Sequence, residues 1–418
     1  MPKNRRIERE GGGRQASIPR LAWLIGPALV AGVAYLDPGN VASNMTAGAT
    51  FGYLLVWVVV LGNAMAWLIQ YLSAKLGIVT GESLPEVLGR RLRNRWGRRA
   101  YWLQAELVAM ATDIAEVIGG AVALNLLFGL PLLLGGAITG AVSISLLLVQ
   151  SRGGAEPFEF VVIGLLAIIA VGFTFGVFVA PPDPAGIAGG LLPRFEGTDS
   201  VLLAASILGA TIMPHAIYAH SALARDRFRS ERGFSTRRLL RATRWDVTVA
   251  MLIAGTVNLC ILLLAAANLA GVPGTDSLEG AYAALYTGLG PVVAVLFAVG
   301  LLASGQASTS VGAYAGAEIM HGLLHVRIPL IWRRLVTLLP ALVILAIGFD
   351  PTAALVLSQV VLSFGIPFAL VPLVSLTARS DVLGGFRNRM ITTGAGVAAS
   401  IFLIALNGLL LWLVLTGG

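Results

Sequence analysis

Two proline-centred polar motifs interrupt long apolar runs of this chain: "LDPGN" at 36–40 and "IMPHA" at 212–216. Proline has no N–H, so in a helical run the carbonyl oxygen four residues earlier loses its partner. Pro214 thereby frees the carbonyl of Ala210. Backbone unwound within an apolar layer is tolerated only when it is buried in protein or lines a wet cavity. The motifs therefore predict two helix breaks that expose polar backbone to a shared interior.

The two breaks together offer a set of ligands for a cation. Asp37 supplies a carboxylate, Asn40 an amide oxygen, Ala210 a carbonyl and Met213 a thioether. Oxygen ligands alone suit Mg²⁺ and Ca²⁺, and a soft sulfur favours Mn²⁺, Fe²⁺, Co²⁺ or Cd²⁺. Three structural interpretations stay open: Asp37 as a helix N-cap before a proline, Asn40 as a partner for the same break, and Met213 as core packing.

A second group of titratable side chains lies in the apolar run 101–127. Glu106, Asp113 and Glu116 are spaced so that they share one broad helix face. Carboxylates on one face of such a helix are not expected to face lipid, and they indicate either a proton relay or pairing with arginine.

Three basic or titratable residues elsewhere in the sequence complete the candidate proton pathway. His215 follows Pro214 directly, and its ordinary pKa suits protonation near neutrality. Arg333 and Arg334 are candidate counter-ions to the carboxylates. The alternative is that both arginines are ordinary charges at the cytoplasmic end of a helix.

The elements that must position these residues are membrane helices. Of the 418 residues 57% are hydrophobic and only 12% charged, and the mean hydropathy is +0.84, which excludes an ordinary soluble protein. One cysteine, Cys260, excludes a disulfide framework and a cysteine metal cluster.

Apolar runs predict eleven spans, at 21–47, 52–76, 101–127, 131–150, 158–180, 199–224, 245–271, 283–318, 328–347, 351–377 and 389–416. The eighth is too long for one crossing, so we expect its end to be tilted or cytoplasmic.

The basic residues predict the orientation of these spans. All but one of the 29 Lys and Arg residues, Arg194, lie in the N-terminal tail or at the connections after even-numbered spans. This separation puts the N-terminus in the cytoplasm and the C-terminus outside. We interpret the basic runs at 90–99 and 237–244 as topology signals facing anionic lipid headgroups, not as nucleic-acid sites. The outer connections are acidic and would concentrate cations.

The order of the spans suggests two related halves. Residues 1–20 form a cytoplasmic tail, 21–180 a first repeat, 199–377 a second repeat, and 389–416 an eleventh helix. Five spans in each half give the halves opposite topology, and the first span of each carries one proline motif. Paired interrupted helices of inverted repeats indicate a transporter site near the middle of the membrane.

The two motifs and several other segments resemble the Nramp family of proton-coupled divalent metal transporters, in its bacterial manganese-transporter branch. The similar segments are "AYLDPGN" (34–40), "QAELVAMATDIAE" (104–116), "GATIMPHAIYAHSAL" (209–223), "LLASGQASTSVG" (301–312), "LSQVVLSFGIPFAL" (357–370) and "ALNG" (405–408). The resemblance implies an all-α membrane fold of the LeuT type: a 5+5 inverted repeat with an eleventh helix and interrupted helices 1 and 6.

The same resemblance implies how the site works. It assigns the metal to Asp37, Asn40, Met213 and the carbonyl of Ala210, and it adds Gln359 in some conformations. Asn407 matches a family asparagine to which we assign no role. The sequence keeps Met213, which some relatives that move Mg²⁺ or Al³⁺ lack, and this favours transition metals, Mn²⁺ before Fe²⁺.

Other functions remain to be separated from this one. A sodium-coupled transporter of small organic solutes could share the architecture, although an aspartate with a thioether suits a metal better. A passive metal channel would need no titratable relay. We find no nucleophile–base set or phosphate loop, so we expect no enzyme and no cofactor. We expect a monomer in the bacterial plasma membrane, with divalent metal ions and protons as its partners.

Overall fold

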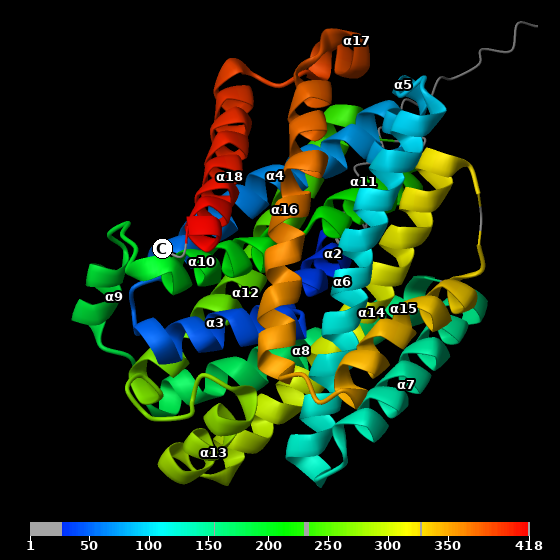
Figure 1. Ribbon diagram of the computed structural model, residues 1–418. Coiled ribbons are helices and arrows are strands. Elements are labelled where there is room, and N and C mark those ends of the chain that lie inside the picture. The colour runs from blue at the N-terminus through cyan, green and yellow to red at the C-terminus, as the bar shows by residue number, and fades with distance from the viewer. Residues whose placement is uncertain (1–26, 154, 230–233, 327, 417–418) are drawn as a thin grey trace, which may run out of the picture.

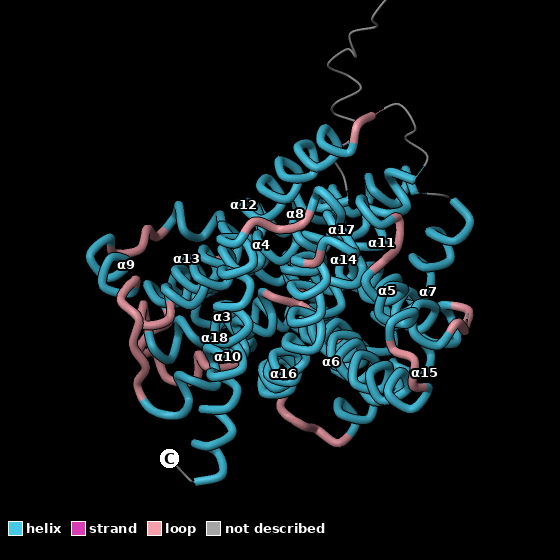
Figure 2. Tube along the Cα trace, turned by 90° about the horizontal axis from the view of Figure 1, so that it is seen from above, coloured by secondary structure: helices cyan, strands magenta, loops and turns pink. Residues whose placement is uncertain are grey.

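The computed structural model describes residues 27–153, 155–229, 234–326 and 328–416, so the predicted tail at 1–20 lies outside the described residues. In the described ranges every regular element is a helix (Figure 2). In chain order these are α2 (Pro27–Val33), η1 (Ala34–Leu36), α3 (Pro38–Phe51), α4 (Val56–Thr80), α5 (Leu84–Arg91), α6 (Arg95–Phe128), α7 (Leu132–Gly153), α8 (Ala155–Val179), α9 (Pro184–Gly190), α10 (Gly197–Thr211), α11 (Pro214–Arg229), α12 (Thr236–Asn268), α13 (Leu278–Leu289), α14 (Pro291–Leu324), α15 (Leu330–Ala346), α16 (Pro351–Ala378), α17 (Ser380–Leu383), η2 (Gly384–Phe386) and α18 (Met390–Thr416).

The first predicted break is present between η1 and α3 (Figure 1). Asp37 leaves the helical conformation, with ψ at 163°, and Pro38 begins the next helix. Asp37 is the N-cap of α3, so the capping interpretation of this residue is confirmed. Capping and ligand binding are compatible, because a carboxylate has two oxygens.

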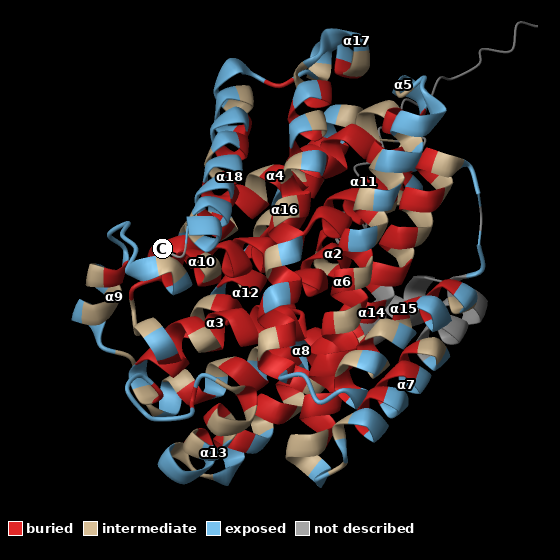
Figure 3. Ribbon diagram, viewed as in Figure 1, coloured by how far each residue is buried: buried red, intermediate tan, exposed pale blue. Residues whose placement is uncertain are grey.

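The second predicted break separates α10 from α11. α10 ends at Thr211, Ile212 has ψ at 61°, and Pro214 begins α11. The proline cannot donate a backbone hydrogen bond, so the chain changes direction at the residues that the sequence singled out. Both interrupted helices lie in the buried centre of the bundle (Figure 3).

Helix α16 packs against both breaks, and two glycines permit the close approach. A Cβ on Gly39 would lie 1.7 Å from Nε2 of Gln359, and a Cβ on Gly209 would lie 1.9 Å from the backbone oxygen of the same residue. Any side chain at Gly209 would push α16 away from α10. The packing therefore brings a third helix to the point where the two breaks meet.

The predicted spans overlap the observed helices, although residues 21–26, the start of the first span, lie outside the described residues. Within the described ranges, seven helices, counting α10 with α11 as one, are long and apolar enough to cross a membrane: α4, α6, α10–α11, α12, α14, α16 and α18. Shorter apolar helices cover 27–36, 132–145 and 163–179, and α15 has 17 residues. The eighth span was wrong as one helix, because Gly290 takes a positive φ of 93° and Pro291 begins a new helix, α14.

Two other helices begin earlier than their predicted spans. α6 begins at Arg95, with Asn94 as its N-cap, and α12 begins at Thr236. Their additional first turns are polar and basic, so hydropathy could not include them. The boundaries assigned to the two repeats stay a prediction.

Candidate metal and proton site

The carboxylate of Asp37 is fully buried and is held by uncharged donors. One oxygen accepts the backbone N–H of Asn40 at 2.8 Å, and the other accepts Nε2 of Gln359 at 3.0 Å. Among the described residues, no Lys, Arg or His side chain forms an ion pair with it. A buried carboxylate without a counter-ion is costly, so this position favours binding of a cation.

Asn40 connects the two breaks. Its side-chain nitrogen donates to the carbonyl of Tyr35 in the first break and, at 3.5 Å, to the carbonyl of Ala210 in the second. Its side-chain oxygen accepts a hydrogen bond from Asn44. The freed carbonyl of Ala210 thus faces the first break, as the sequence predicted.

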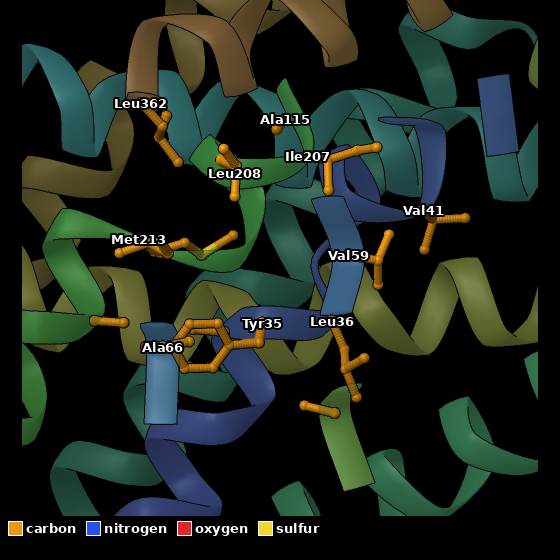
Figure 4. Packing of buried hydrophobic residues seen from close by; sticks show 14 of the residues in the cluster. Tyr35, Leu36, Val41, Val59, Ala66, Ala115, Ile207, Leu208, Met213 and Leu362 are labelled. Atoms are coloured by element: carbon orange, nitrogen blue, oxygen red, sulfur yellow. The ribbon is translucent and has the colours of Figure 1, made fainter. Parts of the chain in front are cut away.

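The remaining two predicted metal ligands lie at the same place. Met213 is fully buried in the turn between α10 and α11 (Figure 4). The side-chain oxygen of Gln359 is buried and has no hydrogen-bond partner in the described structure, while its nitrogen bonds Asp37. Hydrogen bonds thus join Asp37, Asn40, Ala210 and Gln359, and Met213 adjoins them along the chain. We call these five residues the Asp37 site.

The breaks are supported by side chains that sequence analysis missed. Asn258 on α12 donates to the carbonyl of Tyr35 at 3.1 Å, and Ser304 on α14 donates to the carbonyl of Leu36. Ser43 and Ser206 meet at 2.6 Å and so join the two interrupted helices. Polar residues isolated in apolar spans were the available signal for these contacts, because buried polar groups need partners.

A buried chain of polar side chains also holds Tyr35. Gln70 donates to its hydroxyl, and the Gln70 oxygen lies 2.6 Å from Nδ1 of His220. This chain links η1 to α4 and α11. Asn407, to which the sequence assigned no role, exchanges two hydrogen bonds with Ser363, at 2.8 and 2.9 Å, and fastens α18 to α16.

The predicted carboxylates of α6 pair with the two predicted arginines. Arg333 binds Glu106 at 2.8 Å, and Arg334 binds Asp113 at 2.8 Å and Glu116 at 3.2 Å. Both arginines are buried, so they are counter-ions and not exposed topology charges. We call these five residues the acid–arginine cluster.

The acid–arginine cluster has three carboxylates and two guanidinium groups. One oxygen of Glu116 is buried without a hydrogen-bond partner in the described part of the chain. Arg334 is held further by Ser143 at 2.9 Å and Thr309 at 3.3 Å. Because Arg334 has a second carboxylate in Asp113, Glu116 can take up a proton without leaving an arginine unpaired.

His215 approaches α6 but does not pair directly with the predicted carboxylates. Its Nδ1 lies 3.2 Å from the hydroxyl of Thr112, one turn before Glu116 on the same helix. Its Nε2 is buried and has no partner in the described ranges. The structure therefore places His215 between the second break and α6, with Thr112 as an unpredicted intermediary.

The Asp37 site and the acid–arginine cluster adjoin through α6. A Cβ on Gly119 would lie 2.0 Å from the Cβ of Pro38, so the first turn of α3 rests on α6 one turn beyond Glu116. Within the described residues there is no group of three or more His, Cys, Asp or Glu side chains that could hold a metal. The three carboxylates of the acid–arginine cluster therefore do not form such a group, and the Asp37 site differs from an acid-rich cage in its single carboxylate.

Comparisons with known proteins agree with this architecture. Residues 28–413 match the family described as natural resistance-associated macrophage protein-like, or Nramp. The divalent metal cation transporter MntH of Mycobacterium tuberculosis is 61% identical over 396 residues, covering 94% of this chain and 92% of the relative. The relative of the same name from Bacillus subtilis is 43% identical over 409 residues, covering 97% and 96%.

Solved structures show the same fold. A crystal structure of the Eremococcus coleocola manganese transporter superposes with a TM-score of 0.80 at 34% identity, covering 93% of this chain and 85% of that one. A nucleobase-cation-symport-1 family transporter shares the fold alone, with a TM-score of 0.61 at 16% identity, covering 91% and 86%. The predicted LeuT-type fold is confirmed, and the protein is a multi-pass membrane protein. The chain belongs to the Nramp family of transporters.

Proposed function

We propose that this protein carries divalent transition-metal ions, Mn²⁺ before Fe²⁺, Co²⁺ or Cd²⁺, into a bacterial cell together with protons. The observation that carries the proposal is the junction of the two helix breaks, where a fully buried carboxylate, Asp37, has only uncharged partners among the described residues. The names of the similar proteins, a divalent metal cation transporter and a manganese transporter, support the same substrate class.

Metal binding requires two amide side chains to turn. In the structure Asn40 and Gln359 point their nitrogens toward Ala210 and Asp37. A half-turn of each amide would present oxygens to the ion, and the unpartnered oxygen of Gln359 is already buried beside Asp37. The thioether of Met213 would then add the soft ligand that separates Mn²⁺ from Ca²⁺ and Mg²⁺.

The main rival, a sodium-coupled carrier of small organic solutes, fits this geometry less well. Such a carrier uses the N-terminus of a half-helix to hold a substrate carboxylate. Here the N-terminus of α3 is capped by Asp37, whose oxygen accepts the N–H of Asn40. A substrate carboxylate would meet that negative charge.

The acid–arginine cluster is our proposed proton route. A proton would leave Asp37, pass Glu116 and Asp113, and continue by Glu106, with His215 as a second carrier beside Thr112. Arg333 also lines a cavity of about 490 Å³ that contains Arg225, Glu318 and Tyr314. This cavity would receive the proton at the cytoplasmic end of the bundle.

Transport would follow from rocking of the two interrupted helices around the Asp37 site, in a monomer with a cytoplasmic N-terminus and an external C-terminus. Each elementary charge gains about 2.3 kcal/mol per 100 mV of membrane potential, so a negative interior drives a dication strongly inward.

A metal-competition assay in proteoliposomes tests this proposal. Uptake of radioactive manganese is measured at an acidic and a neutral external pH, with Fe²⁺, Co²⁺, Cd²⁺, Ca²⁺ or Mg²⁺ as competitor. We expect saturable uptake that is faster at acidic pH and is inhibited by the transition metals and Cd²⁺, but not by Ca²⁺ or Mg²⁺.

Asp37→Ala is the loss-of-function variant and Asp350→Ala is its matched control, since Asp350 caps α16 at an exposed position. Asp37→Ala should reduce uptake to the level of empty liposomes, and Asp350→Ala should retain it. Full retention of uptake in Asp37→Ala would contradict the site. Uptake that ignores external pH and moves no protons would favour a passive channel.

A further inference from the structure

A second cavity, of about 530 Å³, lies beside the first turns of α12 and the loop before α18, apart from the Asp37 site. Four arginines line it together with two aromatic side chains: Arg237, Arg241, Arg244, Arg389, Tyr71 and Phe386. The three arginines of α12 are spaced by four and three residues, so they project from one helix face. Arg389 approaches from the residue that precedes α18.

In the part of the chain that the structure describes, no acidic side chain neutralises the positive charge of this cavity. Among the described residues, no carboxylate forms an ion pair with any of the four arginines. By contrast, Arg91, the last residue of α5, and Arg379, which precedes α17, both bind Asp381, at 3.1 and 2.9 Å. Arg244 makes a cation–π contact with Tyr71, with its guanidinium carbon 5.1 Å from the centroid of the ring. Like charges that converge on one cavity repel each other, so an anion bound there would relieve the repulsion.

The surroundings of the cavity have the apolar surface that an amphiphile needs. Met390 and Ile391, which follow Arg389 directly, are 91% and 86% exposed. On α12, Trp245 and Leu252 are each 65% exposed, just beyond the arginine face. Tryptophan at the end of a basic helix segment is typical of the membrane interface. A cationic pocket continued by exposed apolar side chains matches a lipid better than a free anion.

We propose that this cavity is a specific binding site for an anionic phospholipid. The phosphate of the headgroup is held by the guanidinium groups of Arg237, Arg241 and Arg389, which are suited to bidentate contacts. The acyl chains lie along the exposed apolar side chains of α12 and α18. With the orientation proposed above, the lipid belongs to the cytoplasmic leaflet. The site is separate from metal transport, so either proposal can fail without the other.

Native mass spectrometry of the purified full chain in neutral detergent tests the site. The protein is titrated with phosphatidylglycerol, with phosphatidylcholine as the zwitterionic lipid and with glycerol phosphate as the soluble headgroup. We expect saturable binding of phosphatidylglycerol, weak binding of phosphatidylcholine, and little competition by glycerol phosphate. One arginine near a membrane surface accounts for about fivefold in affinity, so Arg389→Gln should weaken binding by about that factor.

The triple variant Arg237→Gln, Arg241→Gln and Arg389→Gln should weaken phosphatidylglycerol binding on the order of a hundredfold. Its matched control is Arg93→Gln, Arg95→Gln and Arg99→Gln, which removes the same charge from exposed positions before and within α6.

Equal losses in the two triple variants would overturn the site, because general charge attraction would then explain binding. Equal binding of both lipids would overturn the role of the arginines. Complete competition by glycerol phosphate would overturn the lipid and leave a phosphate site. Arg389→Gln lies outside the helix interiors, so its binding remains readable if the triple variant does not fold.

Discussion

The Asp37 site and the acid–arginine cluster are both buried and both contain carboxylates, yet their charges are balanced differently. Asp37 is surrounded by amide and backbone donors, whereas each carboxylate of the cluster contacts an arginine at 2.8 to 3.2 Å. A lone carboxylate retains its attraction for a dication, whereas two arginines offset most of the charge of the three carboxylates in the cluster. In the proposed function, this difference lets one membrane interior hold a metal at the Asp37 site and pass protons along the acid–arginine cluster.

The largest effect should come from unpairing the cluster. Arg334→Gln leaves Asp113 and Glu116 buried without their shared partner, and breaking a buried pair in this way costs about 3–5 kcal/mol. The free energy of unfolding should fall by that amount, measured by denaturant unfolding in detergent micelles.

The control neutralises the two carboxylates that Arg334→Gln leaves unpaired. Combining Arg334→Gln with Asp113→Asn and Glu116→Gln should restore much of the stability. If Arg334→Gln alone unfolds like the parent protein, the cluster does not depend on charge pairing and the comparison fails.

A second test concerns selectivity at the Asp37 site. Met213→Ala removes the only sulfur from the predicted ligands but leaves Asp37 and its partners in place. Discrimination of Mn²⁺ against Ca²⁺ should fall about tenfold, equivalent to ~1.4 kcal/mol. Competition by Ca²⁺ in the manganese uptake assay measures this change, with Met251→Ala on α12 as a buried methionine that is not a predicted ligand. Unchanged selectivity would show that the sulfur is packing.

A smaller effect is expected where the two regions meet. Thr112→Val keeps the shape of the side chain but removes the hydroxyl 3.2 Å from Nδ1 of His215. A buried nitrogen left without a partner costs about 1 kcal/mol. Thermal unfolding should report this loss, and Thr287→Val, at an exposed site on α13, should not show it. Equal stability of the two variants would remove Thr112 from the connection between α6 and the second break.

The smallest effect belongs to an exposed ion pair outside the membrane. Hydrogen bonds from Arg379 and Arg91 lower the pKa of Asp381 to about 2. Its stabilisation is therefore fully present above the ordinary aspartate pKa and is lost only as the pH falls toward 2. Asp381→Asn should leave the unfolding temperature nearly unchanged at neutral pH, since exposed pairs contribute little. A large loss would show that burial is not what separates strong pairs from weak ones.

The sequence predicted the two helix breaks because proline acts locally. Pro38 and Pro214 each begin a helix where expected, and the freed carbonyl of Ala210 does meet Asn40. The eighth span was predicted from hydropathy alone, which does not register a helix break at a proline. The prediction therefore missed its division, where Gly290 ends one helix and the proline after it begins another.

The pairing within the acid–arginine cluster could be foreseen only as one of two alternatives. Whether Arg334 met Glu116 or faced the cytoplasm depends on how α15 docks against α6, which spacing along the chain does not determine. Contacts such as that of Gln70 with His220 were missed for the same reason, since they join helices 150 positions apart. The candidate residues could be identified from local sequence, but their partners are determined by tertiary packing.

The most direct test of this division of roles is to record manganese and proton movements together in proteoliposomes. Radioactive manganese and an internal pH-sensitive dye would follow both ions in Asp37→Asn, in Glu116→Gln and in the parent protein. We predict that Asp37→Asn loses both fluxes, while Glu116→Gln, in which Arg334 keeps Asp113, retains manganese uptake and loses most of the proton flux. Saturable manganese uptake in Asp37→Asn, or unchanged proton flux in Glu116→Gln, would contradict the account.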